Sequence, residues 1–139
     1  MSFKLSRRSL DRLEGIDDGL QAVVKMAITL TKTDFGVVQG MRTIEQQKEL
    51  VASGASQTMK SKHLDGKAFD IMAFVNGRAS WELNLYDDLA DAIKEAATNL
   101  NIPVCWGAAW AVPQKGYPMD IRKWEGTMEE AMNAYIDLR

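Results

Sequence analysis

The sequence predicts an α+β fold in which residues 1–139 form a single small domain, with helices packed on a small antiparallel sheet. The length of 139 residues, with 46% hydrophobic and 26% charged residues, suits one globular domain around one core. Apolar residues recur at helical spacing in some segments, whereas others are short and rich in β-formers. An Asn-Gly dipeptide between two such short runs is typical of a hairpin, which makes its strands antiparallel.

Four segments carry the signatures of helices. Apolar residues follow the i, i+3, i+4, i+7 rule over about 18–30 and again over about 85–100. Two further helices are expected over about 43–51 and from 127 to 139. Each of these opens with a capping box, formed by Thr43 with Gln46 and by Thr127 with Glu130.

Three short runs are expected to form strands. These are "DFGVVQG" at 34–40, "KAFDIMAFV" at 67–75 and "IPVCWG" at 102–107. The turn "NGR" follows the second run and leads into "ASWEL", which completes a hairpin. The segments 52–62 and 108–126 are predicted to be loops, and the length of the second one is typical of a functional loop.

Composition excludes several functional classes. The 17 basic and 19 acidic residues give a net charge of −2 without a basic stripe, so we expect no nucleic-acid partner. Cys105 is the only cysteine and lies in an apolar run, which favours a buried, inert thiol and excludes an internal disulfide. The N-terminus lacks the apolar core of a signal peptide, and no run approaches the roughly 18 apolar residues of a membrane span. We therefore expect a protein made in the cytosol without membrane insertion.

The stretch "SKHLDGKAFD" at 61–70 contains the only histidine. His63 and Asp70 lie seven residues apart across a turn that contains Gly66, so an imidazole nitrogen and a carboxylate oxygen are able to converge on one zinc ion. Three protein ligands are usual at a catalytic zinc. By spacing alone, a hydrogen-bonded His-Asp pair at the surface is the more frequent outcome.

The same stretch resembles the S-x-H-x-x-G-x-A-x-D signature of the M15 family of zinc peptidases at every fixed position. That family includes D-alanyl-D-alanine carboxypeptidases and phage L-alanyl-D-glutamate endopeptidases. The similarity continues in "MSFKLSRRSLDRLEGI", "FGVVQGMRTIEQQKEL", "NGRASWEL" and "IPVCWGAAW", in the same order. The resemblance implies a Hedgehog/DD-peptidase-like fold and a Zn2+ cofactor.

The resemblance also implies roles for individual residues. His63 and Asp70 match the first two zinc ligands, and Arg42 matches the arginine that faces the substrate's carboxylate. Ser61 matches a serine beside the metal that contacts substrate. Trp110 is a candidate for the wall of the substrate cleft, as is Trp106, although aromatic residues in a core are the more frequent case. Arg42 and Ser61 are therefore the candidate catalytic and substrate-binding residues.

The family pattern is not complete in this sequence. The family supplies its third ligand and general base from a C-terminal D/E-x-x-H segment, and this chain has no second histidine. Either the chain stops before that segment, or the site has decayed so that Tyr135 replaces the histidine and Met132 the base. The second explanation needs Tyr135 on a strand, whereas its apolar spacing is helical, so the first is favoured. Four carboxylates are disfavoured as substitute ligands because such groups are common on solvated helix faces: Asp120, Glu129, Glu130 and Asp137.

Ala109 is a second departure, because related endolysins carry an acidic residue at this position before the tryptophan. If that acidic residue orients a ligand or the substrate, its absence is expected to change their positioning.

These observations together predict a zinc-dependent peptidase of bacterial peptidoglycan that cleaves the L-alanyl-D-glutamate bond of the stem peptide. We expect a monomeric phage endolysin that collects in the host cytoplasm and reaches the cell wall after a holin opens the membrane. We expect a metallopeptidase, and because its third ligand and general base are missing here, both an active and an inactive state of the chain as it stands stay open. Two alternatives stay open: a D-alanyl-D-alanine carboxypeptidase, and an inactive protein that binds peptidoglycan or builds the phage particle.

Overall fold

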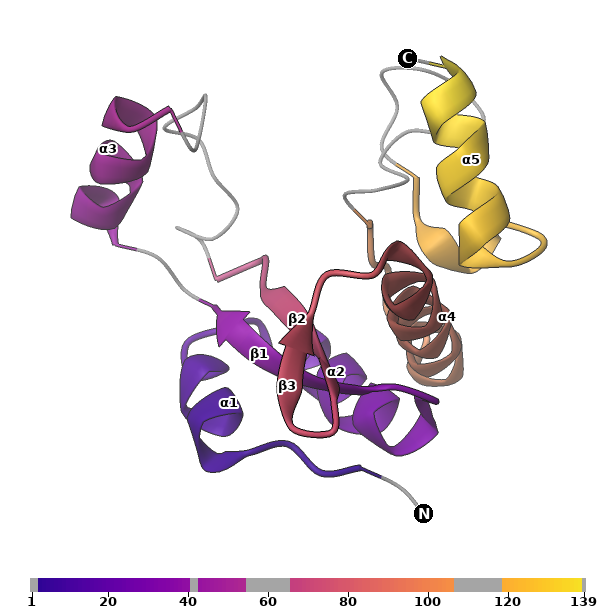
Figure 1. The fold of residues 1–139 in the computed structure, drawn as a ribbon, viewed down its shortest axis with the longest axis horizontal. Coiled ribbons are helices and arrows are strands. Elements are labelled where there is room, and N and C mark those ends of the chain that lie inside the picture. Colours follow the sequence, from indigo (N-terminus) through magenta and orange to yellow (C-terminus); the bar gives the residue numbers. More distant parts are fainter. Residues whose placement is uncertain (1–2, 41–42, 55–65, 107–118, 139) are drawn as a thin grey trace.

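A computed structural model describes residues 3–40, 43–54, 66–106 and 119–138. Figure 1 shows helices gathered around a small central sheet, with α3 on one side of the sheet's upper end and α4 and α5 on the other. The elements, in chain order, are α1 (Arg7–Arg12), α2 (Asp18–Leu30), β1 (Asp34–Gln39), α3 (Ile44–Ala52), β2 (Asp70–Val75), β3 (Arg78–Ser80), α4 (Leu83–Leu100), the 3-10 helix η2 (Ile121–Lys123) and α5 (Met128–Leu138). This confirms the α+β class.

The three strands form an antiparallel sheet in the order β1-β2-β3. Val75 pairs with Arg78, so the loop between β2 and β3 has two residues. Both of them, Asn76 and Gly77, have positive φ values of 52° and 79°. That conformation is the one a type I′ hairpin turn requires, and it confirms the hairpin predicted from the Asn-Gly pair.

The core lies between the sheet and two long helices. Phe35 and Ala73 pair across β1 and β2 and are both buried, as is Val37. The helices contribute the apolar stripes predicted from their spacing: Val23, Val24, Ala27 and Ile28 from α2, and Leu89, Ala90, Ile93, Ala96 and Ala97 from α4. At roughly 25 cal/mol per Å² of apolar area removed from water, burying these stripes is the main stabilising contribution to the fold.

The short helix α1 covers the outer edge of β1, and no apolar stripe in residues 7–12 predicts it. Its Ser9 hydroxyl accepts a hydrogen bond from the Val37 N–H (2.9 Å), and its Arg12 Nη1 donates to the Val37 carbonyl (2.9 Å). These side chains take the place of a neighbouring strand, so the backbone of Val37 is hydrogen-bonded on the edge that faces away from β2.

The predicted helices agree with the structure, whereas one predicted strand begins later than expected and another does not form. α4 begins at Leu83, two residues earlier than expected, and the predicted capping box of α3 is present. The strand expected over 67–75 begins only at Asp70, and residues 102–106 do not form the expected strand. Among the described backbone hydrogen bonds, Val104 accepts one from Ile121 (2.8 Å), and no neighbouring strand of the described chain pairs with 102–106. Propensity for extended structure makes a strand only where a partner completes the ladder.

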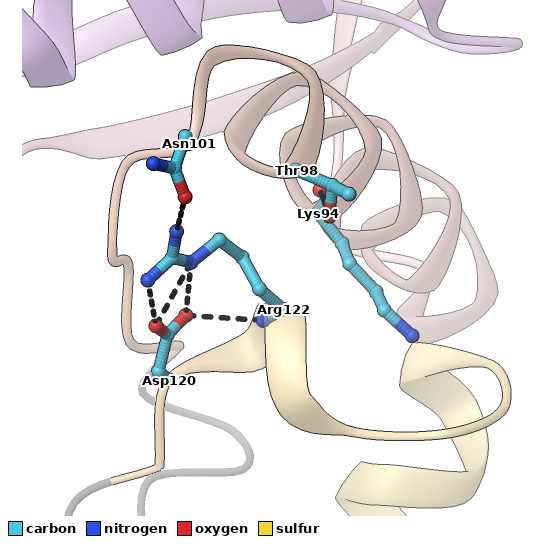
Figure 2. A network of polar contacts seen from close by, with 5 residues as sticks. All are labelled: Lys94, Thr98, Asn101, Asp120 and Arg122. Carbon is cyan, nitrogen blue, oxygen red and sulfur yellow. Dashed lines mark hydrogen bonds and ion pairs between the residues drawn. The ribbon is translucent and has the colours of Figure 1, made fainter.

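The C-terminal helices are fixed to the end of α4 by polar contacts (Figure 2). Arg122 donates to Asp120 through Nη2 (2.7 Å) and to the Asn101 side-chain oxygen through Nη1 (2.7 Å). Asn101 ends α4 in the left-handed conformation with φ 57°. Lys94 donates to the Gly126 carbonyl (2.8 Å) just before α5. The loop predicted over 108–126 thus contains the helix η2, while its residues 108–118 lie outside the described residues.

α5 begins with the predicted capping box, in which the Glu130 N–H donates to Thr127 Oγ1 (3.2 Å) and the Thr127 N–H donates to Glu130 Oε1 (3.3 Å). The Met128 N–H also donates to Asp91 on α4 (2.8 Å). Met128 and Ala131 are buried against the core. Within the described chain, none of the helices combines the length and the apolar character that crossing a bilayer demands.

Candidate active site

Of the candidate site residues, the structure describes Asp70 and Trp106. Arg42, Ser61, His63 and Trp110 lie outside the described residues, as does Ala109. The predicted pairing of His63 with Asp70 at one metal therefore stays a prediction. The surroundings of Asp70 still show what kind of site that end of the sheet is able to form.

Asp70 is the first residue of β2, and its side chain is exposed. It pairs with Gln39, while the next pair is Val37 with Ile71. Val38 is therefore an extra residue in β1, which is a β-bulge. Because of this bulge Gln39, instead of Val38, is the residue of β1 that pairs with Asp70. A bulge beside an active site often redirects a side chain in this way.

Gly66 fixes the turn that leads to Asp70. Its φ is +69°, and a Cβ atom at this position would lie 2.4 Å from the Gly15 carbonyl oxygen. The Gly66 carbonyl accepts a hydrogen bond from the Asp17 N–H (2.7 Å). Only glycine fits both the conformation and the close approach, so the motif glycine holds this turn against the start of α2.

Asp70 lines a cavity of about 740 Å³. Two segments, 67–71 and 102–106, contribute to its lining, and residues of α2, α4, η2 and the α1–α2 connection complete it. The lining residues of the helices and of the α1–α2 connection are Asp17, Leu20, Tyr86, Ala90, Ile93 and Ile121. A cavity of this size with mostly apolar walls and a few polar groups is typical of a binding site.

Tyr86 on α4 shapes the side of this cavity next to β3. Its hydroxyl accepts a hydrogen bond from the Ala73 N–H (3.2 Å) and donates to the Ser80 carbonyl (2.9 Å). The hydroxyl thus bridges the last residue pair of β2 and β3. β3 pairs only with residues 73–75 of β2, so residues 70–72 have no described partner strand on the edge that β3 would occupy. Asp70 and Ile71, at this unpaired part of β2, line the cavity.

Cys105 and Trp106 also line the cavity, and both are half-buried. The expectation of a fully buried Cys105 is therefore wrong, because Cys105 lines the cavity, whereas its neighbour Val104 is buried in the core. Trp106 packs against the core and also lines the cavity, while its predicted role in the wall of the substrate cleft stays a prediction.

Gln39 lines a second, smaller cavity of about 420 Å³, together with residues of α3 and its C-cap, namely Gln46, Glu49, Leu50 and Ser53. Asp70 thus lines the larger cavity, and its strand partner Gln39 lines the smaller one.

The substitute ligands disfavoured from the sequence are not gathered around Asp70. Asp120 accepts hydrogen bonds from Arg122 through both of its oxygens (Figure 2). Burial acts to raise the pKa of Asp120, but the hydrogen bonds and charge of Arg122 outweigh it and lower this pKa below its ordinary value. Among the residues that the structure describes, no three His, Cys, Asp or Glu side chains are grouped to hold a metal ion. Tyr135 lies on the helix α5, so the strand that the decayed-site alignment requires is absent there.

Asp87, next to Tyr86, is a buried carboxylate that the sequence did not single out. It is 7% exposed, and its Oδ1 has no hydrogen-bond partner among the described groups. Burial is the main cause that raises its pKa, followed by the charges of Glu129, Asp91 and Asp88. Asp87 is not among the residues that line the cavity, so we relate its burial and raised pKa to stability.

Sequence reasoning also missed Gln39 and Tyr86. The bulge that pairs Gln39 with Asp70 has no sequence signal of its own. Tyr86 lies within the helix predicted over about 85–100 and was not singled out, because its hydrogen bonds to β2 and β3 join residues that are separated in the sequence.

Comparisons with known proteins agree with this arrangement. The sequence model of the family described as phage L-alanyl-D-glutamate peptidase matches residues 1–129. The L-alanyl-D-glutamate peptidase of Escherichia phage T5 is 35% identical over 114 residues, which are 79% of this chain and 83% of that protein. The peptidase of the same name from Listeria phage A118 is 28% identical over 107 residues, which are 75% of this chain and 37% of that protein.

A solved structure is similar as well. It is the crystal structure of the L-Ala D-Glu endopeptidase ChiX of Serratia marcescens, with a TM-score of 0.75 and 33% identity. The match covers 87% of this chain and 92% of that one. Both the sequence and the fold therefore place this chain among such peptidases.

Proposed function

The chain belongs to the phage L-alanyl-D-glutamate peptidase family, and from that membership we propose that it hydrolyses the L-alanyl-D-glutamate bond in the stem peptides of bacterial peptidoglycan. The observation that carries this proposal is the match of the family over residues 1–129, together with the cavity beside Asp70. The substrate is then part of the cell wall, and the reaction is the hydrolysis of a peptide bond.

We propose zinc as the cofactor, with His63 and Asp70 as two of its ligands. Asp70 suits this role because its carboxylate is exposed, lies at the fixed end of a strand and lines the cavity. When bound, zinc polarises a carbonyl group and activates a water molecule for attack. Gln39, opposite Asp70, is placed to orient that carboxylate or the substrate beside it.

Arg42 and Ser61 are the proposed substrate-binding residues. A guanidinium group binds a carboxylate through two parallel hydrogen bonds, which suits Arg42 to the α-carboxylate or side-chain carboxylate of a peptide. Ser61 would donate a hydrogen bond to a peptide carbonyl, and Trp110 would form part of the wall of the substrate cleft. All three roles rest on the match of these positions to the family motif.

The missing ligand and general base are proposed to come from a polypeptide segment that lies along the large cavity. Residues 67–69 and 102–106 have strand-like sequences, border this cavity and form no ladder in the described chain. A strand between them would provide both with hydrogen-bond partners. The tyrosine bridge that ends β3 leaves room for such a strand along β2.

The biological setting is proposed in the same way. We propose a monomer that acts as an endolysin, collects in the host cytoplasm and reaches the cell wall once a holin has opened the membrane. These points rest on the family and on the expectation from the N-terminal sequence.

The experiment that tests this function uses purified peptidoglycan, the chain and added zinc. A synthetic peptide containing Asp-x-x-His and a following apolar run is added in one arm, and its His→Ala version in another. Mass spectrometry is expected to find stem peptides that begin with D-glutamate, with the largest yield in the arm that supplies the histidine. Release of D-alanine alone would instead indicate a carboxypeptidase. Binding to peptidoglycan without any new amino group in any arm would indicate an inactive binding protein.

A further inference from the structure

Trp81 is the most exposed large hydrophobic side chain that the structure describes, with 77% of its surface in water. It follows β3 directly and precedes α4, and Leu83 at the start of α4 is 56% exposed. Fully burying an aromatic side chain typically contributes roughly 1.5–3 kcal/mol to stability. Trp81 makes little of that contribution because most of its side chain is exposed, so burial among the described residues does not explain this tryptophan.

The backbone beside Trp81 is held firmly at the cavity. The Ser80 carbonyl accepts the hydrogen bond from Tyr86, and Tyr86 lines the cavity that contains Asp70. β3 runs antiparallel to β2, so it ends near the end of the sheet where β2 begins (Figure 1). Trp81 is therefore joined, through one residue and one hydrogen bond, to the wall of the candidate active site.

The substrate of the proposed function has a sugar next to the bond that is cut. In peptidoglycan the amino group of the L-alanine is acylated by the lactyl group of N-acetylmuramic acid. A peptide residue spans at most about 3.6 Å, so the sugar lies within a short distance of the scissile bond on its L-alanine side. A peptidase that cuts here meets the saccharide at the rim of its site.

We propose that Trp81 is a saccharide-binding residue that stacks on the N-acetylmuramic acid next to the scissile bond. The C–H faces of a pyranose ring are apolar and carry slightly positive hydrogens, which are attracted to the negative face of the indole. The exposed ring and its fixed backbone suit this contact because little conformational freedom is lost on binding. This inference rests on the proposed function, since it takes its ligand from that substrate.

Binding of two small ligands to the whole chain tests the inference. One is N-acetylmuramyl-L-alanyl-D-glutamate, and the other is acetyl-L-alanyl-D-glutamate, which lacks the sugar. NMR titrations give a Kd for each. The native chain is expected to bind the muramyl ligand roughly three- to tenfold more tightly, and Trp81→Ala should abolish that difference.

Two variants serve as controls. Trp81→Phe keeps an aromatic face and should keep most of the preference for the sugar. Leu83→Ala removes another exposed apolar side chain at the same junction and should leave both Kd values unchanged. Both positions are exposed, so all variants should unfold at nearly the native denaturant concentration.

The inference is overturned if the native chain shows no preference for the muramyl ligand, including the case in which it binds neither. It is also overturned if Trp81→Ala keeps the preference for the muramyl ligand or weakens the binding of both ligands by the same factor. Neither result depends on hydrolysis. A chain that shows the preference but never cleaves peptidoglycan would support the inference and contradict the proposed function.

Discussion

The two ends of the sheet are built from the same strands in different ways. At the hairpin end, Val75 pairs with Arg78 across a regular two-residue turn, and a Cβ added to Gly77 meets nothing within 4 Å. At the Asp70 end, β1 has a bulge, Tyr86 bridges β2 and β3, and Gly66 is pressed against Gly15. Departures from regular structure thus gather where the candidate ligand lies, which is typical of functional sites.

Alanine at the two turn glycines tests this difference most strongly. Gly66→Ala is expected to destabilise the fold by roughly 2–4 kcal/mol, because it adds both a positive-φ strain and a steric overlap. Gly77→Ala, the matched control, adds only the conformational strain and should cost about 1 kcal/mol. Urea unfolding measures both. Equal losses would mean that the turn before Asp70 is no more constrained than the hairpin turn.

Removing the Tyr86 hydroxyl tests the bridge between β2 and β3. Tyr86→Phe leaves the Ala73 N–H and the Ser80 carbonyl without their shared partner, and we expect a loss of roughly 1–2 kcal/mol. Hydrogen exchange at the Ala73 amide should accelerate, while the amide of Phe35 in the sheet core should change less. Unchanged exchange at Ala73 would show that the strands hold together there without the hydroxyl.

Asp87 provides a smaller effect with a defined pH dependence. Its pKa is raised in the folded protein, first by burial and then by three neighbouring carboxylates, so its contribution to stability is highest in acid. That stability is lost as the pH rises from the ordinary value of 3.8 through the raised pKa. Asp87→Asn should therefore stabilise the fold by about 1 kcal/mol at neutral pH and flatten this pH dependence. Urea unfolding at several pH values checks both points, and a destabilised variant at neutral pH would refute the account.

Much of the fold was predictable because local rules and packing agree in it. The helix stripe of 18–30, both capping boxes and the Asn-Gly hairpin all occur as expected. The predictions failed where structure depends on partners that a local pattern does not contain. Residues 67–69 and 102–106 have strand-like sequences but no neighbouring strand in the described chain. α1 is stabilised by its side-chain bonds to Val37, which a local pattern does not show.

The candidate site was predictable from its motif and not from its geometry. Asp70 was identified by its place in "SKHLDGKAFD", and the structure adds its strand position and its cavity. Gln39 and Tyr86 were identified only from the structure. Gln39 pairs with Asp70 because of the strand register at the bulge, and Tyr86 bonds to Ala73, which lies 13 positions away in the sequence.

The most direct test of the central claim is zinc binding by variants at the two ends of the sheet. Asp70→Asn and His63→Ala should each weaken zinc binding, measured by isothermal titration calorimetry, by at least about tenfold without changing the unfolding midpoint. Asp34→Asn, at the opposite end of the β1–β2 pair, should leave zinc binding at the native level. Native zinc affinity in Asp70→Asn, or an equal loss in Asp34→Asn, would contradict the assignment of the Asp70 end as the metal site.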